Sequence, residues 1–196
     1  VPVDESLGEQ AVLLALAATA YHTMAGHAKP DLIVGHGVLG RLMARITLLR
    51  DEGPVTIWET NPVRSDAGSL YQVIHPDADT RHDYGAVYDV SGDSGLLNVL
   101  IKRIRRGGEV VLAGFYSAPL SFDFSPAFIR EARLRVAAEW TQSDLAAVKK
   151  LVETGRLSLD GLITHRTEAM DAADAYRTAF GDPACLKMIL DWRRCS

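Results

Sequence analysis

Residues 31–46 read DLIVGHGVLGRLMARI, and they predict a strand, a tight turn and a helix in immediate succession. Leu32–Val34 is a short apolar run of the kind that forms a buried strand. Glycines follow at positions 35, 37 and 40, and the apolar residues after them recur at helical spacing. A GxGxxG pattern therefore spans the junction between a strand and a helix.

Each of the three glycines has its own structural role in such a pattern. Gly35 permits a sharp turn, Gly37 lets a pyrophosphate approach the backbone, and Gly40 lets the helix pack closely on the strand. The positive end of the helix and its free N–H groups favour a diphosphate at this point. The expected contacts of the diphosphate are Gly35, His36, Gly37, Val38, Leu39 and Gly40.

An acidic residue stands where a dinucleotide site needs one. Val55–Trp58 predicts a second strand, and Glu59 follows it. A carboxylate about 20 residues after the glycines hydrogen-bonds the adenosine ribose, which favours NAD over NADP. Thr60, Asn61 and Arg64 complete this side of the expected site; Arg64 is either a solvated loop residue or a group that reaches a phosphate.

The composition is that of an ordinary globular domain. Of 196 residues, 47% are hydrophobic and 23% charged, and the net charge of −4 argues against a nucleic-acid or anionic membrane partner. The apolar run Ala11–Ala20 is too short to cross a bilayer. Cys185 and Cys195, ten residues apart, match no metal motif and predict reduced thiols in a cytoplasmic protein.

The rest of the chain alternates strands with helices. A capping box at Ser6 and Glu9 predicts a first helix to about Met24, stopped by Gly26. Ser94 and Ser143 are expected to cap two later helices, stopped by Gly107-Gly108 and by Gly155. A short helix begins at Ser125-Pro126, and another runs from about Met170 to Phe180, with Gly181 as its stop. The further expected strands are Tyr71–Ile74, Ala86–Val90, Glu109–Phe115, Leu134–Glu139, Leu162–Thr164 and Leu186–Trp192. This alternation predicts a doubly wound parallel α/β sheet.

The order of these parts resembles the cofactor domain of the medium-chain dehydrogenase/reductase family. The resemblance rests on GxGxxG, an acid after the second strand, DVSG, GGEVVLAG and the closing ITHR, AYRTAF and KMILDW. It implies a Rossmann sheet of strand order 3-2-1-4-5-6. It also implies a leading helix in residues 1–28, an NAD-binding domain in 29–156, and a return segment in 157–196 that would pack on a catalytic domain absent from this sequence.

Within that family, several stretches are most similar to members that act on a tetrapyrrole. They are VPVDESLGEQAVLLALAATAYH, LIVGHGVLGRL, WETNP, YDVSGDSGLL, LAGFYSAPLSF and AYRTAFGDPACLKMILDWR. The implied reaction is NAD-dependent oxidation of the 3-(1-hydroxyethyl) group of a bacteriochlorophyllide to an acetyl group. The fragment alone is expected to be inactive. Its exposed return strands predict association into a homo-oligomer, or disorder there.

The resemblance also places residues at the nicotinamide. Ser91 and Gly92 follow the fourth strand, Gly114 and Phe115 follow the fifth, and both pairs would flank the ring. No residue is identified as the proton acceptor. His36 is expected to be a turn residue more than a relay, His22 a core or interface histidine, and Tyr116 a wall of the pocket. No cluster with zinc spacing occurs, so no metal site is predicted.

Three alternatives stay open. A methyltransferase that uses S-adenosylmethionine also has a glycine-rich first turn and an acid after the second strand, and it would add an antiparallel hairpin to the sheet. A non-enzymatic NAD-sensing domain would explain why no catalytic group is found. A medium-chain dehydrogenase or reductase acting on another alcohol or carbonyl compound is also compatible with the pattern.

Overall fold

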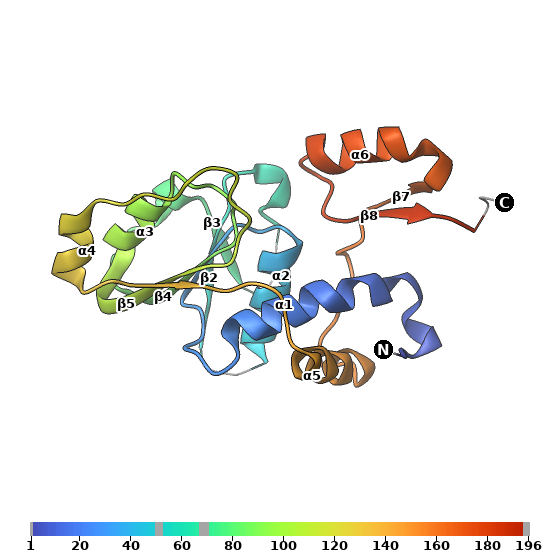
Figure 1. Cartoon of the computed structure of the whole chain (residues 1–196), viewed down its shortest axis with the longest axis horizontal. Coiled ribbons are helices and arrows are strands. Elements are labelled where there is room, and N and C mark those ends of the chain that lie inside the picture. The colour runs from blue at the N-terminus through green and yellow to red at the C-terminus, as the bar shows by residue number, and fades with distance from the viewer. Residues whose placement is uncertain (1, 50–52, 67–70, 194–196) are drawn as a thin grey trace.

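A parallel six-stranded sheet forms the centre of the molecule (Figure 1). The computed structural model describes residues 2–49, 53–66 and 71–193. The strand order is β3-β2-β1-β4-β5-β6, as predicted. The strands are β1 (Leu32–Val34), β2 (Thr56–Trp58), β3 (Gln72–Ile74), β4 (Tyr84–Asp89), β5 (Ile104–Leu112) and β6 (Arg133–Val136). Each pairs with its neighbours in parallel, so the antiparallel hairpin of a methyltransferase is missing from this sheet.

The two faces of the sheet carry two separate apolar cores. Ile33, Ile57 and Val111 point into a core shared with helices α1 (Leu14–Met24) and α2 (Val38–Leu48), whereas their neighbours Leu32 and Val110 point into a core on the opposite face. The side chains alternate because successive residues of a strand face opposite sides. Burial on both sides explains why these strands are nearly continuous apolar runs in the sequence.

The N-terminal helix differs from its prediction at its start. A 3₁₀ helix, η1 (Glu5–Leu13), precedes α1 (Leu14–Met24). Asp4, and not Ser6, provides the cap, because the Asp4 carboxylate accepts the Ser6 N–H at 2.9 Å. The predicted capping box of Ser6 and Glu9 is therefore wrong. The predicted end at Met24 is confirmed, and Gly26 follows with a φ of +73°.

The other helices of the main domain begin or end at different residues from those predicted. Thr141 replaces Ser143 as the cap because its hydroxyl pairs with Asp144 in a capping box. Ser94 does not cap, and the following helix ends before Gly107-Gly108 because Ile104 already pairs with Tyr84 in the sheet. The elements are α2 (Val38–Leu48), η2 (Pro62–Arg64), η3 (Pro76–Ala78), α3 (Leu97–Arg103), α4 (Phe124–Arg130) and α5 (Gln142–Glu153).

The C-terminal residues form a separate small unit, here called the return unit: β7 (His165–Glu168), η4 (Ala169–Asp171), α6 (Ala172–Gly181) and β8 (Met188–Asp191). The two strands pair in parallel with each other. The predicted strand Leu162–Thr164 is wrong, because these residues form no strand. Leu162 is instead fully buried in the core of the main domain. Each strand of the return unit has the other as its partner on one edge, while among the described residues its outer edge pairs with no further strand, so association through this unit stays a prediction.

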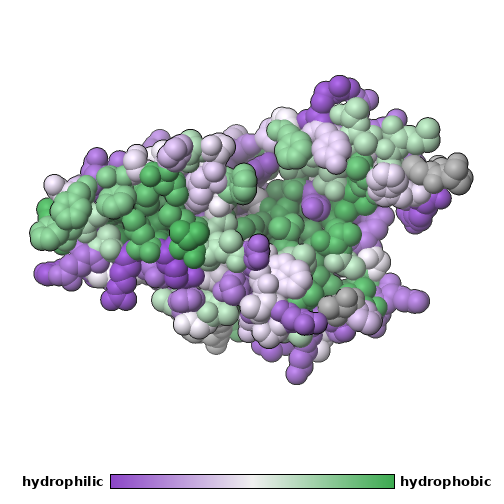
Figure 2. Space-filling view, viewed as in Figure 1, coloured by the Kyte–Doolittle hydropathy of each residue, from purple (hydrophilic) through white to green (hydrophobic). Residues whose placement is uncertain are grey.

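Apolar surface gathers in two places in Figure 2, over α4 and between α6 and α1. The first holds exposed side chains of Phe124, Phe128 and Ile129. The second continues into a groove of about 310 Å³ between α6 and β8, which Tyr176 and Phe180 help to line. Within the described ranges, no helix combines the length and apolarity needed to cross a bilayer.

Candidate dinucleotide-binding site

A groove of about 290 Å³ lies at the carboxyl ends of β1, β2 and β4. The strand order reverses between β1 and β4, and ligands of open α/β sheets bind at such a switch point. The lining residues are Val34, Gly35, His36, Gly37, Trp58, Glu59, Thr60, Arg64, Pro76, Val90, Ser91, Asp93 and Leu96. Val38, Leu39, Gly40, Asn61, Gly92, Gly114 and Phe115 were also predicted for the site, and they lie outside this lining.

The glycine turn has the geometry that the sequence predicts. Gly35 has a φ of +103°, and a Cβ there would lie 3.1 Å from the Cα of Ser91. A Cβ at Gly40 would lie 1.9 Å from the carbonyl oxygen of Gly35, so only glycine allows α2 this close to the turn. A Cβ at Gly37, by contrast, would meet no atom within 4 Å. The space over Gly37 is the open cradle that a diphosphate requires, and Gly37 caps α2 without a side chain.

Glu59 is held by main-chain N–H groups. Its Oε2 accepts the N–H of His36 at 3.0 Å, and its Oε1 accepts the N–H of Asn61 at 2.8 Å. Each carboxylate oxygen keeps a lone pair for a further donor. The half-buried carboxylate is therefore fixed at the groove and able to accept ribose hydroxyls.

His36 is a buried side chain that is turned away from the diphosphate cradle. Its Nδ1 lies 2.5 Å from the carbonyl oxygen of Arg64, and its Nε2 lies 2.8 Å from the Tyr71 hydroxyl. Burial lowers its pKa to about 4, and the charge of Arg41 acts in the same direction. A side-chain phosphate contact by His36 is therefore not what the structure shows. The part of Tyr71 in this contact was not foreseen from the sequence.

Two arginines fix the segment after Glu59. The Arg41 guanidinium donates to the carbonyl oxygens of His36, Arg64 and Asp66 at 3.1–3.2 Å. The Arg64 guanidinium donates to the carbonyl oxygens of Pro183 and Cys185, at 2.6 and 3.4 Å. The Arg64 side chain is bonded to the return unit, unlike the solvated loop residue of the first interpretation. Arg64 also lines the groove, so its contact with a phosphate stays a prediction.

The residues predicted for the nicotinamide side pack backbone against backbone. A Cβ at Gly92 would lie 2.9 Å from the carbonyl oxygen of Phe115, and one at Gly114 would lie 2.9 Å from the Gly92 nitrogen. The buried Asp89 closes the adjoining turn by accepting the Ser91 N–H and hydroxyl. Phe115 itself is 94% exposed beside this junction. Both loops thus meet beside the groove, and of the four residues predicted for the nicotinamide side Ser91 is the one in its lining.

The remaining candidates for proton transfer are not in the lining of the groove. His22 pairs with Asp144 at 2.8 Å between α1 and α5, and His165 lies 3.7 Å from Asp182 in the return unit. The Tyr116 hydroxyl donates to the backbone carbonyl of Asp89, and burial raises the pKa of Tyr116. Among the described residues, no three or more His, Cys, Asp or Glu side chains form a set suited to a metal ion. Cys195 lies outside the described residues.

The fold and the position of the groove are those of a Rossmann-type α/β domain, and solved dehydrogenases share its architecture. A short chain alcohol dehydrogenase from Escherichia coli, complexed with NADH, superposes with a TM-score of 0.82 at 17% identity over 97% of this chain and 61% of its own. Acetophenone reductase from Geotrichum candidum, in complex with NAD, gives 0.82 at 21% identity over 97% and 58%.

Sequence comparison identifies the relatives. The chain is 58% identical over 193 residues to 2-desacetyl-2-hydroxyethyl bacteriochlorophyllide A dehydrogenase of Rhodobacter capsulatus, covering 97% of this chain and 62% of that protein. The protein of the same name from Cereibacter sphaeroides is 54% identical over 195 residues, covering 98% and 61%. No protein-family model matches. The chain is a homologue of these dehydrogenases and spans about three fifths of their length.

Proposed function

We propose that this chain is the NAD-binding part of a dehydrogenase that oxidises the hydroxyethyl side chain of a bacteriochlorophyllide-type tetrapyrrole to an acetyl group. The open cradle over Gly37 carries the cofactor assignment, because its neighbours Gly35 and Gly40 are closed against protein atoms. The substrate assignment rests on 58% identity to a protein named for that substrate.

The chain's residues divide the work of holding the cofactor. The turn from Gly35 to Gly40 would bind the diphosphate, and the Glu59 carboxylate would accept the adenosine ribose hydroxyls. A fixed negative charge at that point disfavours a 2′-phosphate, so NAD is preferred over NADP. Bound NAD supplies the hydride acceptor. The loops at Ser91, Gly92, Gly114 and Phe115 would form the wall beside it.

The return unit is proposed to dock on a part of the whole protein that residues 1–196 do not include. No residue of β7 or β8 is fully buried, and the groove between α6 and β8 is lined by Tyr176, Phe180 and Leu190. The relatives extend well beyond the stretch that they share with this chain. An apolar surface of this kind is covered in a stable protein.

Self-association is proposed through β6, whose outer edge is unpaired in the sheet. Val136 on this strand is 77% exposed, and the exposed aromatic residues of α4 lie next to it in sequence. An open edge with apolar side chains can pair with the same edge of a second copy. Sedimentation of the wild type and of Val136→Lys tests this, and a monomeric wild type at micromolar concentration would contradict it.

Nucleotide binding is tested first on this chain. Isothermal titration of the wild type with NADH and NADPH should show tighter binding of NADH. Gly37→Val should abolish binding while the domain still folds, because the added side chain enters open space. Glu59→Ala should weaken NADH by about tenfold through the loss of charged hydrogen bonds. Retained binding in Gly37→Val would refute the cradle.

The reaction is tested on the whole protein that contains this chain. Mixed with the hydroxyethyl bacteriochlorophyllide and NAD, it should shift the red absorbance band of the pigment as NADH forms. NADH formation from simple alcohols without a pigment shift would point to a dehydrogenase with another substrate. NADH binding by the whole protein with no turnover of any alcohol would favour the NAD-sensing alternative.

A further inference from the structure

The imidazole of His36 connects the glycine turn to Arg64 and to Tyr71, two residues of the segment that follows Glu59. His36 belongs to the turn, and its own N–H donates to Glu59. Its ring reaches the Arg64 carbonyl on one side and the Tyr71 hydroxyl on the other, at 2.5 and 2.8 Å. The Tyr71 ring meets it edge to face, with centroids 5.4 Å apart. His36 is buried, so its ring depends on these protein partners for its hydrogen bonds.

The hydrogen bonds fix the tautomer and charge of the ring. A carbonyl oxygen only accepts, so Nδ1 of His36 carries the proton and donates to Arg64. Nε2 is then the acceptor for the Tyr71 hydroxyl. Burial and the nearby Arg41 charge keep this imidazole neutral at neutral pH. The ring therefore serves as one donor and one acceptor in a fixed direction.

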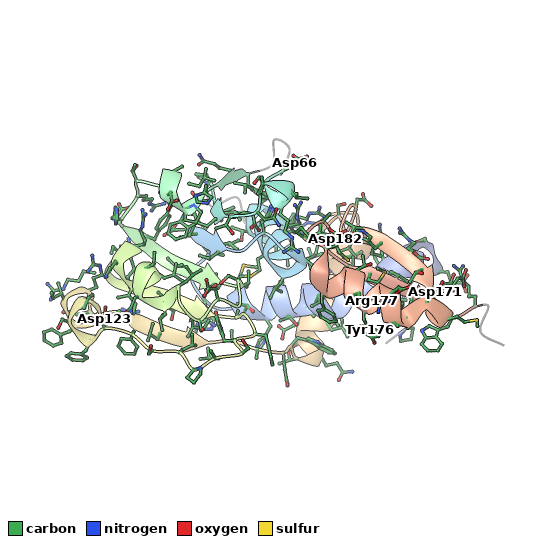
Figure 3. The ribbon with its side chains drawn as sticks, turned by 90° about the horizontal axis from the view of Figure 1, so that it is seen from above. Asp66, Asp123, Asp171, Tyr176, Arg177 and Asp182 are labelled. Carbon is green, nitrogen blue, oxygen red and sulfur yellow. The ribbon has the colours of Figure 1, made fainter. Side chains whose placement is uncertain are left out.

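This arrangement also determines where the Arg64 charge lies. The carbonyl of Arg64 is drawn inward by His36 and by Arg41, while its guanidinium extends to the carbonyls of Pro183 and Cys185. Asp182, labelled in Figure 3, follows the last residue of α6 and directly precedes Pro183. The Arg64 guanidinium therefore binds the carbonyls of Pro183 and Cys185.

We propose that His36 is a positioning residue for the adenosine half of the dinucleotide. It holds Glu59 and the segment from Asn61 to Arg64 so that the carboxylate faces the ribose while the Arg64 guanidinium stays with the return unit. His36 thereby sets the preference for NAD over NADP. This inference rests on the proposed NAD-binding function, and it adds a residue whose side chain touches neither the diphosphate cradle nor the nicotinamide side.

The test measures which half of the nucleotide loses affinity. His36→Leu fills the space without either hydrogen bond, and Tyr71→Phe removes one bond but keeps the ring contact. His22→Asn is the matched control, since it removes a histidine pair between α1 and α5, away from the groove. Titrations of this chain use NADH, NADPH and reduced nicotinamide mononucleotide, which lacks the adenosine half.

The expected result is selective. His36→Leu should weaken NADH by about tenfold and narrow the preference for NADH over NADPH by a similar factor, with unchanged affinity for the mononucleotide. Tyr71→Phe should weaken NADH by about one third of that effect on a logarithmic scale. This variant tests the inference even if His36→Leu does not fold. His22→Asn should change none of these affinities.

Three different results would overturn the inference, and they are distinguishable. If the wild type binds NADH well and both variants keep its preference while their melting temperatures fall, His36 is a structural residue only. Equal losses for NADH and the mononucleotide would likewise refute a role confined to the adenosine half. If the wild type binds neither dinucleotide, the proposed function fails, and the inference fails with it.

Discussion

The six-stranded sheet and the return unit bury their strands to different degrees. Both are parallel, and both have helices packed on them. However, all three residues of β1 are buried, whereas every residue of β7 and β8 is at least partly exposed. Helix α6 has only Ala175 buried, and Phe180 on it is 86% exposed. The strands at the centre of the sheet lie in apolar cores on both faces, whereas the return unit leaves most of its apolar side chains at least partly exposed.

The largest effect on stability is expected at Gly40, where α2 packs closely against the glycine turn. Gly40→Ala should destabilise the domain by about 3 kcal/mol, because the new Cβ must displace the Gly35 carbonyl or move α2. Urea unfolding followed by tryptophan fluorescence measures this loss. Gly37→Ala is the control, three residues away in open space, and it should unfold near the wild-type midpoint. Equal midpoints for both variants would contradict the close packing at Gly40.

Acid should reveal the burial of His36 in the same glycine turn. Its pKa is about 4 in the folded chain, against about 6.5 when exposed, so the unfolded state binds more protons between these values. The contribution of His36 to the free energy of unfolding is fully present above pH 6.5. It is lost on acidification toward pH 4, and the whole shift amounts to on the order of 3 kcal/mol. Urea midpoints across this range measure the slope. His36→Asn should remove this part of it, and an unchanged slope would contradict the burial.

A smaller loss is expected at Asp79, on the opposite face of the sheet. One of its carboxylate oxygens accepts both Trp58 Nε1 and the Tyr84 hydroxyl, each at 2.6 Å. Burial alone would raise its pKa, but these bonds and the Arg81 N–H hold the pKa of Asp79 below its usual range. Asp79→Asn should cost about 2 kcal/mol at pH 7, since one of the donors then faces an amide NH₂. Calorimetry measures this, and a neutral outcome would argue against the network.

The smallest effect is expected in the return unit. Phe180→Ser should change the free energy of unfolding of this chain by less than about 0.5 kcal/mol, because the side chain is already in water. In the whole protein the same substitution should lower the melting temperature, since there the ring would be covered. A large loss in the isolated chain would show that the return unit already has a completed core.

The course of the backbone could be predicted largely from the sequence, whereas most side-chain contacts could not. The three glycine roles follow from spacing and steric limits, which are local, and the strand order follows from the resemblance to a known family. The roles of His36, Tyr71 and Arg64 depend on residues 28 to 121 positions apart, and no local pattern encodes such contacts. Leu162 was misplaced for the same reason, since its apolar character predicted a strand when it contributes to a distant core.

The clamp on Glu59 has an evolutionary consequence. Both of its donors are main-chain N–H groups, of His36 and Asn61, and only proline lacks such a group. The two hydrogen bonds to an acid at position 59 therefore do not themselves require particular side chains at positions 36 and 61, whereas the position of the segment from Asn61 to Arg64 depends on the His36 ring. A lineage can exchange the acid itself through a single codon while the loop around it keeps its shape. Nucleotide choice in this domain is consequently easy to retune without rebuilding the fold.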